Sequence, residues 1–244
     1  MNFCFVYDGS FEGFLTAVFE AYRLKLPVRS FAAAARYSPN LFEEHYSIET
    51  SSEAADRVWK RIAEQGGEFI GKMIFASFLS ELPDVERLIW EYLQKLFSED
   101  GKTFALNPIS AEAMPLIRIT NSVRRERDRL HGFLRFQKLE EELFFAGIEP
   151  ESHIIPLITP HFVRRFPQFS WIIWDINRKK GVFFDRKTVE EITIDRFHLP
   201  RFEDDFCKMW KSYHQSACIQ ERKNPLLQRQ MLPRRYWAQL PEKN

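Results

Sequence analysis

The stretch ELFFAGIEPESHIIPLITPHFVRRFPQFSWIIWDINRKKGVFF at residues 142–184 decides the fold class. It begins with an apolar run at 142–148, which predicts a strand, and residues 132–139 before it predict a paired strand. Residues 152–166 then place isoleucines and phenylalanines along one side of a predicted helix.

The end of this stretch has the pattern of a hairpin. Residues 170–176 and 181–184 are apolar and flank the polar turn NRKK. The resulting order β-β-α-β-β favours an antiparallel sheet with a helix packed across one face. We therefore expect an α+β fold.

Towards the N-terminus the sequence predicts a strand followed by a helix. Residues 1–7 alternate aromatic and other side chains, which is typical of a strand. Ser10 is placed to cap a helix whose apolar stripe continues to Tyr22. Another short strand is predicted at 44–49.

Residues 50–105 are expected to form an acidic helical lobe. Helices are predicted at about 53–65 and 68–81, and Gly66-Gly67 between them ends the first one. A further helix follows through Phe97.

We expect a single domain over residues 1–244 that contains this lobe. A helix at about 110–131 leads into a sheet-containing core at about 110–244, to which the strand and helix of 1–25 also contribute. A helix stripe at about 202–217 precedes a basic C-terminal helical clasp.

The composition favours a protein of a reducing compartment. The chain has 244 residues, 45% hydrophobic and 28% charged, as in ordinary globular proteins. Cys4, Cys207 and Cys218 match no metal or redox spacing. The first residues lack a basic signal-peptide region, and no apolar run approaches the ~20 residues that span a bilayer. We expect a cytoplasmic protein without a membrane segment, a metal or a cofactor.

Charge is segregated along a chain whose formal net charge is only +1. Residues 40–100 contain 13 acidic and 6 basic side chains, residues 115–138 contain 2 and 7, and residues 221–244 contain 2 and 6. Such segregation can produce a basic face on a nearly neutral protein. Each run is equally compatible with simple surface solvation.

One basic cluster is a ridge on the predicted helix at 110–131. Arg118, Ser122, Arg125 and Arg129 are spaced by 4, 3 and 4 and therefore share one helical face. Arginines on one ridge repel one another unless an anion relieves them, and phosphate suits their bidentate geometry. The alternative is pairing with the acidic lobe. Arg127 would lie in the opposite, apolar stripe, either buried in an ion pair or as a sign that the helix ends early.

A second cluster lies in the last turn of the helix at 152–166. His161, Arg164 and Arg165 project away from its apolar side and could contact phosphate. Basic residues at this end of a helix also suit the helix dipole, which is a purely structural explanation.

The third cluster is the C-terminal segment ERKNPLLQRQMLPRRYW at 221–237. Its cations can contact phosphates, its aromatic rings can stack on bases, and its amides can read base edges. The candidate residues are Arg222, Asn224, Gln228, Arg229, Arg234, Arg235, Tyr236 and Trp237. Pro225 and Pro233 bracket a short helix at about 226–231. The alternative is a clasp packed on the core, and both roles can hold together.

The sequence contains no complete catalytic motif. No phosphate-binding glycine loop, nucleophile elbow, zinc-protease helix or paired CxxC is present, and the six histidines are scattered. Candidate carboxylates for general acid–base chemistry are Asp8, Glu12, Glu126, Asp175 and Glu221. A carboxylate beside arginine more often forms a structural ion pair, so the catalytic residues stay unassigned.

Four motifs carry a family resemblance. They are YDGSFEGFLTAVFEAY at 7–22, RRERDRLHGFLRF at 124–136, PHFVRRFPQFSWIIWDINR at 160–178 and ERKNPLLQRQMLPRRYWAQLPE at 221–242. Across essentially its whole length the chain resembles a bacterial family of domains of unknown function described as DNA metabolism proteins.

The resemblance implies a genomic context for the protein but no particular reaction. It implies a gene beside that of a radical SAM protein of DNA modification or repair, and in some members fusion to a uracil-DNA glycosylase-like domain. Many members have histidine at the position of Asp128 and a small or apolar residue at that of Arg127. Any role of that histidine would not transfer to this chain.

The leading hypothesis is a DNA-binding accessory protein of DNA metabolism or repair that acts with a radical SAM partner. One alternative is a DNA-processing enzyme of glycosylase or nuclease type. Another is a protein-interaction module that binds no nucleic acid.

Overall fold

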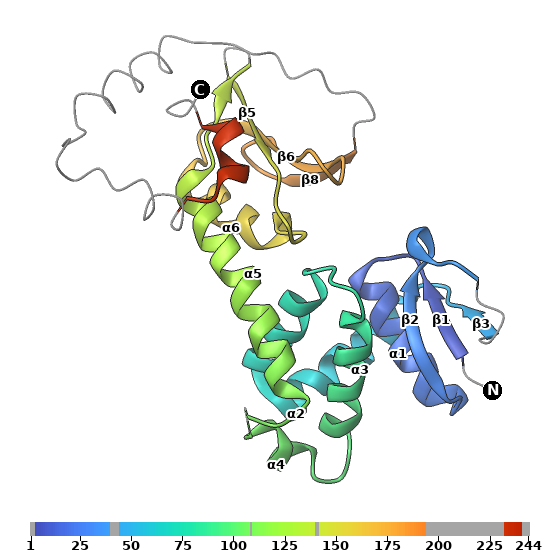
Figure 1. The fold of residues 1–244 in the computed structure, drawn as a ribbon. Coiled ribbons are helices and arrows are strands. Elements are labelled where there is room, and N and C mark those ends of the chain that lie inside the picture. The colour runs from blue at the N-terminus through green and yellow to red at the C-terminus, as the bar shows by residue number, and fades with distance from the viewer. Residues whose placement is uncertain (1–2, 40–43, 108, 140–141, 194–231, 241–244) are drawn as a thin grey trace. The chain divides into compact units, whose positions relative to one another are not determined.

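The computed structural model describes residues 3–39, 44–107, 109–139, 142–193 and 232–240 (Figure 1). The chain forms two compact units: unit 1 is Met1–Arg124 and unit 2 is Arg125–Asn244. Both units combine helices with strands, which confirms the predicted α+β class. No helix within the described ranges is long and apolar enough to cross a bilayer.

Unit 1 contains a small parallel sheet. Its strands are β1 (Phe3–Tyr7), β2 (Val28–Ala33) and β3 (Glu44–Ser47), in the order β2-β1-β3. Helix α1 (Phe11–Leu24) connects β1 to β2, and such a crossover is what a parallel pair requires. The sequence predicted β1 and β3 but missed β2.

Helix α1 begins and packs as its sequence predicts. The Ser10 hydroxyl accepts a hydrogen bond from the Gly13 amide at 2.8 Å, which is an N-cap. Phe14, Leu15 and Val18 are buried. A Cβ at position 13 would overlap Asp8 Oδ1, so the start of the helix requires glycine there.

The helices of unit 1 follow the predicted pattern, including its break. Helix α2 (Ser52–Phe78) is interrupted at Gly67, which has φ 71° and ψ −177°. Glycine adopts this conformation without a steric penalty, and the chain therefore kinks at the predicted position. Helices α3 (Val85–Leu96) and α4 (Gly101–Ala105) follow.

The first strand and helix belong with these helices. The sequence grouped residues 1–25 with the sheet of 110–244, but the structure places them in unit 1. The physical reason is the apolar stripe of α1, which packs on α2. Tyr7 at the end of β1 is buried and donates a hydrogen bond to Glu86 of α3 at 3.0 Å.

Helix α5 (Ala113–Phe133) crosses the boundary between the units. Its unit 1 half is fixed to α2 by buried hydroxyls. Thr120 Oγ1 donates to the Met73 carbonyl at 3.1 Å and lies 3.1 Å from Ser77 Oγ. Hydrogen bonding satisfies these polar atoms in an otherwise apolar contact.

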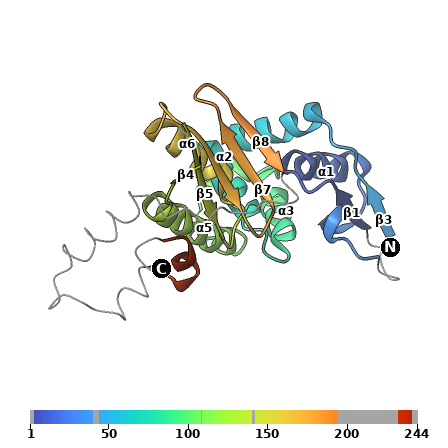
Figure 2. The same cartoon turned by 90° about the horizontal axis from the view of Figure 1, so that it is seen from above.

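Unit 2 contains a five-stranded sheet in the order β4-β5-β6-β7-β8. The strands are β4 (Gln137–Lys138), β5 (Leu143–Ile148), β6 (Ser170–Asp175), β7 (Lys180–Phe184) and β8 (Val189–Thr193). Figure 2 shows β7 and β8 on the side of the sheet away from β4. The predicted hairpin is confirmed as β6–β7.

The expectation of a wholly antiparallel sheet is wrong at its centre. Strands β5 and β6 are parallel because α6 (Ile155–Arg165) carries the chain back to the starting edge between them. The first predicted strand, 132–139, shrinks to two residues because α5 continues to Phe133. Strand β8 was not predicted.

Aromatic rings fill the core between α6 and this sheet. Phe136 lies 5.6 Å from Phe162 of α6 and 5.9 Å from Trp171 of β6, between ring centroids. Trp171 in turn contacts Phe184 of β7 at 5.1 Å. These contacts confirm the predicted helix packed on one face of the sheet.

The described end of the chain is a short 3-10 helix, η3 (Arg234–Gln239). Tyr236 and Leu240 are buried, and η3 contacts β5. The predicted helices at 202–217 and 226–231 lie outside the described residues.

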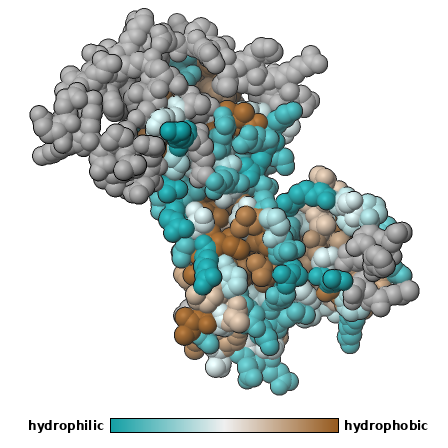
Figure 3. Space-filling model, in the orientation of Figure 1, coloured by the Kyte–Doolittle hydropathy of each residue, from teal (hydrophilic) through white to brown (hydrophobic). Residues whose placement is uncertain are grey.

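Some large apolar side chains of unit 1 are exposed. Figure 3 shows such side chains on the visible face of its helical part. Leu106 is 83% exposed, Ile109 78% and Phe69 59%.

Candidate functional site

The predicted arginine ridge lies on one continuous helix. Arg118 and Arg125 are exposed on α5 and Arg129 is half-buried. Arg118 belongs to unit 1, whereas Arg125 and Arg129 belong to unit 2. Within its own unit, and among the residues described, none of the three has an ion-pair partner. Among the described residues of unit 2, Arg125 and Arg129 are thus available to an anion.

Arg127 lies on the other side of α5 from this ridge. It is two positions from Arg125 and from Arg129, which turns a helix by about 200°. The helix does not end early at this point, since it continues to Phe133. Arg127 instead forms an ion pair with its neighbour Asp128, with Nη2 2.7 Å from Oδ1. Its side chain is 35% exposed, so the pair is only partly buried.

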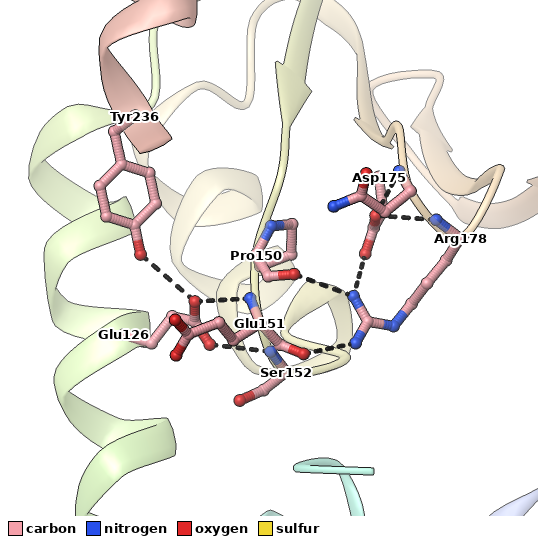
Figure 4. Close-up of polar contacts among 8 residues, drawn as sticks. Glu126, Pro150, Glu151, Ser152, Asp175, Arg178 and Tyr236 are labelled. Atoms are coloured by element: carbon pink, nitrogen blue, oxygen red, sulfur yellow. Dashed lines mark hydrogen bonds and ion pairs between the residues drawn. The ribbon is translucent and has the colours of Figure 1, made fainter. Parts of the chain in front are cut away.

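Glu126 is a buried carboxylate that fixes a loop to α5 (Figure 4). Its two oxygens accept the backbone N–H groups of Glu151 at 2.8 Å and Ser152 at 2.9 Å. The hydroxyl of Tyr236 in η3 also donates to Glu126 Oε1, at 3.3 Å. Glu126 therefore joins three segments that are far apart in the sequence.

Asp175 holds the other end of the same loop (Figure 4). It is fully buried at the end of β6 and accepts Nη1 of Arg178 at 2.8 Å. The Arg178 guanidinium also donates to the carbonyls of Pro150 at 3.2 Å and Glu151 at 2.7 Å. The loop between β5 and α6 is thus held between two buried carboxylates.

These contacts give three sequence candidates structural roles. Both oxygens of Glu126 and of Asp175 accept hydrogen bonds, an arrangement that stabilises a fold. Tyr236 was also considered for base stacking, but its ring is buried and its hydroxyl binds Glu126. For Tyr236 the structure therefore favours a role in a C-terminal clasp packed on the core over a role in base stacking.

Asp8 caps the start of α1. Its oxygens accept hydrogen bonds from the Ser10 amide and hydroxyl and from the Thr50 hydroxyl at 2.7–2.8 Å. Burial raises the pKa of Asp8, but these hydrogen bonds outweigh burial and lower it below the usual range. Asp8 is therefore a stable carboxylate. Glu12 is exposed in the first turn, and Glu221 lies outside the described residues.

A cavity of about 480 Å³ in unit 1 contains none of the predicted basic clusters, and both arginines that line it are paired. Arg23 and Arg57 line it together with their partners Glu20 and Glu53. Among the described residues, no group of three histidine, cysteine or acidic side chains could hold a metal.

Two histidines meet where α5 and α6 pack. The rings of His131 and His161 are stacked, with centroids 4.1 Å apart and planes 15° apart. His131 Nε2 is buried and has no hydrogen-bond partner in the described part of the chain. Burial lowers the pKa of His131, and His161 and Arg127 lower it further.

The arginines of α6 lie beside this pair. Arg164 is exposed and one turn beyond His161, close enough to lower the pKa of His131. No ion pair of Arg164 exists within the described ranges. Arg165 is also exposed, and its guanidinium lies 5.8 Å from the ring centroid of Phe166. The structure therefore brings His131 to the predicted cluster of His161, Arg164 and Arg165.

The sequence offered no signal for this contact. His131 and His161 are on different predicted helices, and only the packing of α5 on α6 places one ring on the other.

The C-terminal candidates are described only in part. Arg234 is exposed, with its guanidinium 5.8 Å from the ring centroid of Trp237. Trp237 is half-buried and donates its indole N–H to the Leu232 carbonyl at 3.1 Å. Arg235 lies in η3. The remaining candidates, Arg222, Asn224, Gln228 and Arg229, lie outside the described residues.

Comparison with known proteins identifies a family. No curated protein matches the chain. A family model described as a domain of unknown function, DUF4130, matches residues 83–242. This range contains three of the four motifs quoted above, while the motif at 7–22 precedes it. Because the model covers more than half of the sequence, the chain belongs to the DUF4130 family.

Proposed function

We propose that this protein binds DNA through phosphate contacts made by its basic helices, as an accessory factor in DNA metabolism or repair that acts with a radical SAM partner. The observation that carries the DNA-binding part is the unpaired charge of unit 2. Arg125 and Arg129 on α5 and Arg164 on α6 have no carboxylate partner within the described part of that unit.

Other exposed arginines of the protein do form ion pairs with carboxylates. In the same unit, Arg186 forms an ion pair with Glu142 at 3.0 Å. On the helices of unit 1, Arg57 pairs with Glu53 and Arg87 with Glu91. Among the described residues, carboxylates therefore pair with these other exposed arginines but not with Arg125, Arg129 or Arg164.

Unpaired arginines on one helix are unfavourable without a ligand. Like charges four residues apart, such as Arg125 and Arg129, destabilise a helix by about 0.2–0.5 kcal/mol. A phosphate backbone removes this repulsion and accepts charge-assisted hydrogen bonds from each guanidinium. It also releases counterions, so the binding would weaken as salt increases.

Titration of labelled single- and double-stranded DNA at several salt concentrations tests this proposal. The double variant Arg125→Ala with Arg129→Ala should bind more weakly and show a smaller dependence on salt, by about one counterion per lost contact. Arg186→Ala is the matched control, because it removes an exposed but paired arginine from the same unit. Equal binding by the double variant and this control, or binding insensitive to salt, would contradict the proposal.

The partner part of the proposal rests on the family resemblance. It is tested by co-purification with the radical SAM protein encoded beside the gene, with and without nuclease treatment. A complex that forms only when DNA is present supports an accessory role on DNA. A complex that survives nuclease, together with no DNA binding, would replace it with a protein-interaction role.

A further inference from the structure

We propose that the stacked pair His131–His161 and Arg164 form a binding site for a phosphate group in unit 2. The proposed ligand is the terminal phosphomonoester of a DNA strand. The identity of this ligand rests on the proposed DNA binding, whereas the phosphate site itself can be tested without DNA.

The geometry places an unsatisfied nitrogen beside a cation. His131 Nε2 is buried without a hydrogen-bond partner among the described residues, and buried polar atoms of this kind are rare. The ring of His161 lies against His131 at 4.1 Å. Arg164 follows one helical turn after His161 and is exposed. Two stacked imidazoles, one with an unsatisfied nitrogen, and an exposed guanidinium that acts electrostatically on His131 therefore lie in one region of unit 2.

The surrounding charges select an anion over a metal cation. The charged groups around His131 are Arg127 and Asp128 from its own helix and Arg164 from α6, with His161 as the other titratable group. Asp128 is the only carboxylate among them, and Arg127 already binds it at 2.7 Å. A divalent cation would face two guanidinium groups. Two nearly parallel imidazole rings also do not direct their nitrogens to a common metal.

A dianion suits this site better than an internal phosphodiester. Protonation of both stacked rings is unfavourable while they face only each other and two arginines. A doubly charged phosphomonoester would compensate the charge of Arg164 and of at least one protonated imidazole. An internal phosphodiester carries a single charge and would compensate less.

Binding should therefore take up protons. Burial, His161 and Arg127 hold the pKa of His131 below its usual value, so His131 is neutral at pH 7 without a ligand. A bound phosphate favours the protonated ring and raises that pKa. Because the complex binds more protons than the empty protein, affinity increases as the pH falls through the range between the two pKa values of His131, for as long as the phosphomonoester keeps its second charge, whose pKa is about 6. The increase is up to about tenfold per pH unit for each proton taken up.

The test follows the histidine ring signals of the full chain by NMR during titration with inorganic phosphate. Chloride at matched ionic strength controls for screening, and His45 of unit 1 is an internal reference. Phosphate should raise the pKa of His131, whereas the ring signals of His45 should not respond to phosphate. Arg164→Gln should weaken phosphate binding about tenfold or more, while the neighbouring control Arg165→Gln changes it less than twofold.

A further variant separates loss of the site from loss of the fold. His161→Phe keeps an aromatic ring against His131 but removes one titratable group, so the pH dependence of phosphate binding should weaken while the other histidine signals persist. A His131 signal that phosphate does not move, or equal losses from Arg164→Gln and Arg165→Gln, would overturn the site.

Oligonucleotides then identify the source of the phosphate. A 5′- or 3′-phosphorylated strand should bind more tightly than the hydroxyl-ended strand of the same sequence, and more so at pH 6 than at pH 8. If inorganic phosphate shifts His131 but neither end phosphate adds affinity, the assignment to a strand end is wrong.

The two proposals fail in different ways. DNA binding that depends on Arg125 and Arg129 but not on His131 or end phosphates refutes this inference and supports the proposed function. A phosphate-induced shift of His131 without any DNA binding refutes the proposed function and supports the phosphate site.

Discussion

The two units differ in the ion pairs that the exposed basic side chains of their helices form. On the helices of unit 1, several exposed basic side chains pair with glutamates four residues away, as in Arg57–Glu53, Lys72–Glu68 and Arg87–Glu91, although Arg61 and Arg118 have no ion-pair partner among the described residues of that unit. On α5 and α6 of unit 2, Arg125, Arg129 and Arg164 have no such partner in the described part of that unit. A net charge near zero therefore conceals a unit in which several helix charges form ion pairs and another whose helix arginines have no described partner and can bind a ligand.

The units also differ in how they hold a buried carboxylate. Glu86 of unit 1 accepts the Tyr7 hydroxyl and pairs with Arg36, whose side chain is 50% exposed. In unit 2, Glu126 binds backbone N–H groups, and Asp175 binds a guanidinium that is only 17% exposed. Unit 2 therefore depends more on enclosed polar contacts, and these contacts fix the loop next to its basic helices.

Removal of Asp175 should have the largest effect on stability. Asp175→Ala leaves the guanidinium of Arg178 enclosed without its carboxylate, and breaking a buried pair in this way costs about 3–5 kcal/mol. Urea unfolding combined with hydrogen exchange should show faster exchange in β6 and β7 and little change in α2.

The control is Glu142→Ala, which removes a carboxylate from an exposed pair with Arg186 in the same unit. It should cost at most about 1 kcal/mol. Similar losses from the two variants would show that burial does not distinguish these pairs.

Glu126→Gln should have the next largest effect. An amide keeps one acceptor oxygen but turns its NH₂ group towards either the Glu151 or the Ser152 amide. The loss of a hydrogen-bonded buried charge should cost about 1.5–3 kcal/mol. Tyr236→Phe removes the hydroxyl that donates to Glu126 at 3.3 Å and should cost about 1 kcal/mol.

A double-mutant cycle of these two changes measures how strongly Glu126 holds η3. If the losses simply add, Tyr236 is held by packing of its ring alone. Hydrogen exchange of residues 232–240 gives an independent reading, since loss of the contact should speed exchange there.

Much of this fold follows from local sequence patterns. The β6–β7 hairpin, the N-cap at Ser10 and the break at Gly67 were all predicted because each depends on residues close in the sequence. The arginine ridge follows from helical spacing in the same way. Residue type and spacing are therefore sufficient to predict features that depend on residues close together in the sequence.

The remaining features depend on contacts between distant segments. The same apolar pattern suits parallel and antiparallel neighbours, so the parallel pairing of β5 with β6 was not predicted even though the helix between them was. Strand β8 reads VEEIT, and its mostly exposed side chains lack the alternation of a half-buried strand. The His131–His161 stack requires the packing of α5 on α6.

The helix cap of unit 1 should have a smaller effect than either carboxylate. Ser10→Ala removes the acceptor of the Gly13 amide and a donor to Asp8. It should cost about 1 kcal/mol, measured as a shift in the urea midpoint. Ser10→Thr is the matched control, since a threonine hydroxyl can make the same bonds. If serine, threonine and alanine were equivalent at this position, the hydroxyl would not stabilise α1.

The smallest expected effect is also the most direct test of the difference between the units. Arg57→Ala removes a paired arginine from α2 and should destabilise the protein by about 0.3–0.5 kcal/mol. Arg125→Ala removes an arginine that has no ion-pair partner among the described residues and lies one turn from the like charge of Arg129, so the expected change is zero or a stabilisation of a few tenths of a kcal/mol. The sign of the change in the free energy of unfolding is more informative than its size. This change is best measured at low salt, where charge interactions are least screened. Added salt should reduce the difference between the two variants. If Arg125→Ala destabilised the protein as much as Arg57→Ala, Arg125 would have a partner within the protein itself, and the argument for an external anion on α5 would fail.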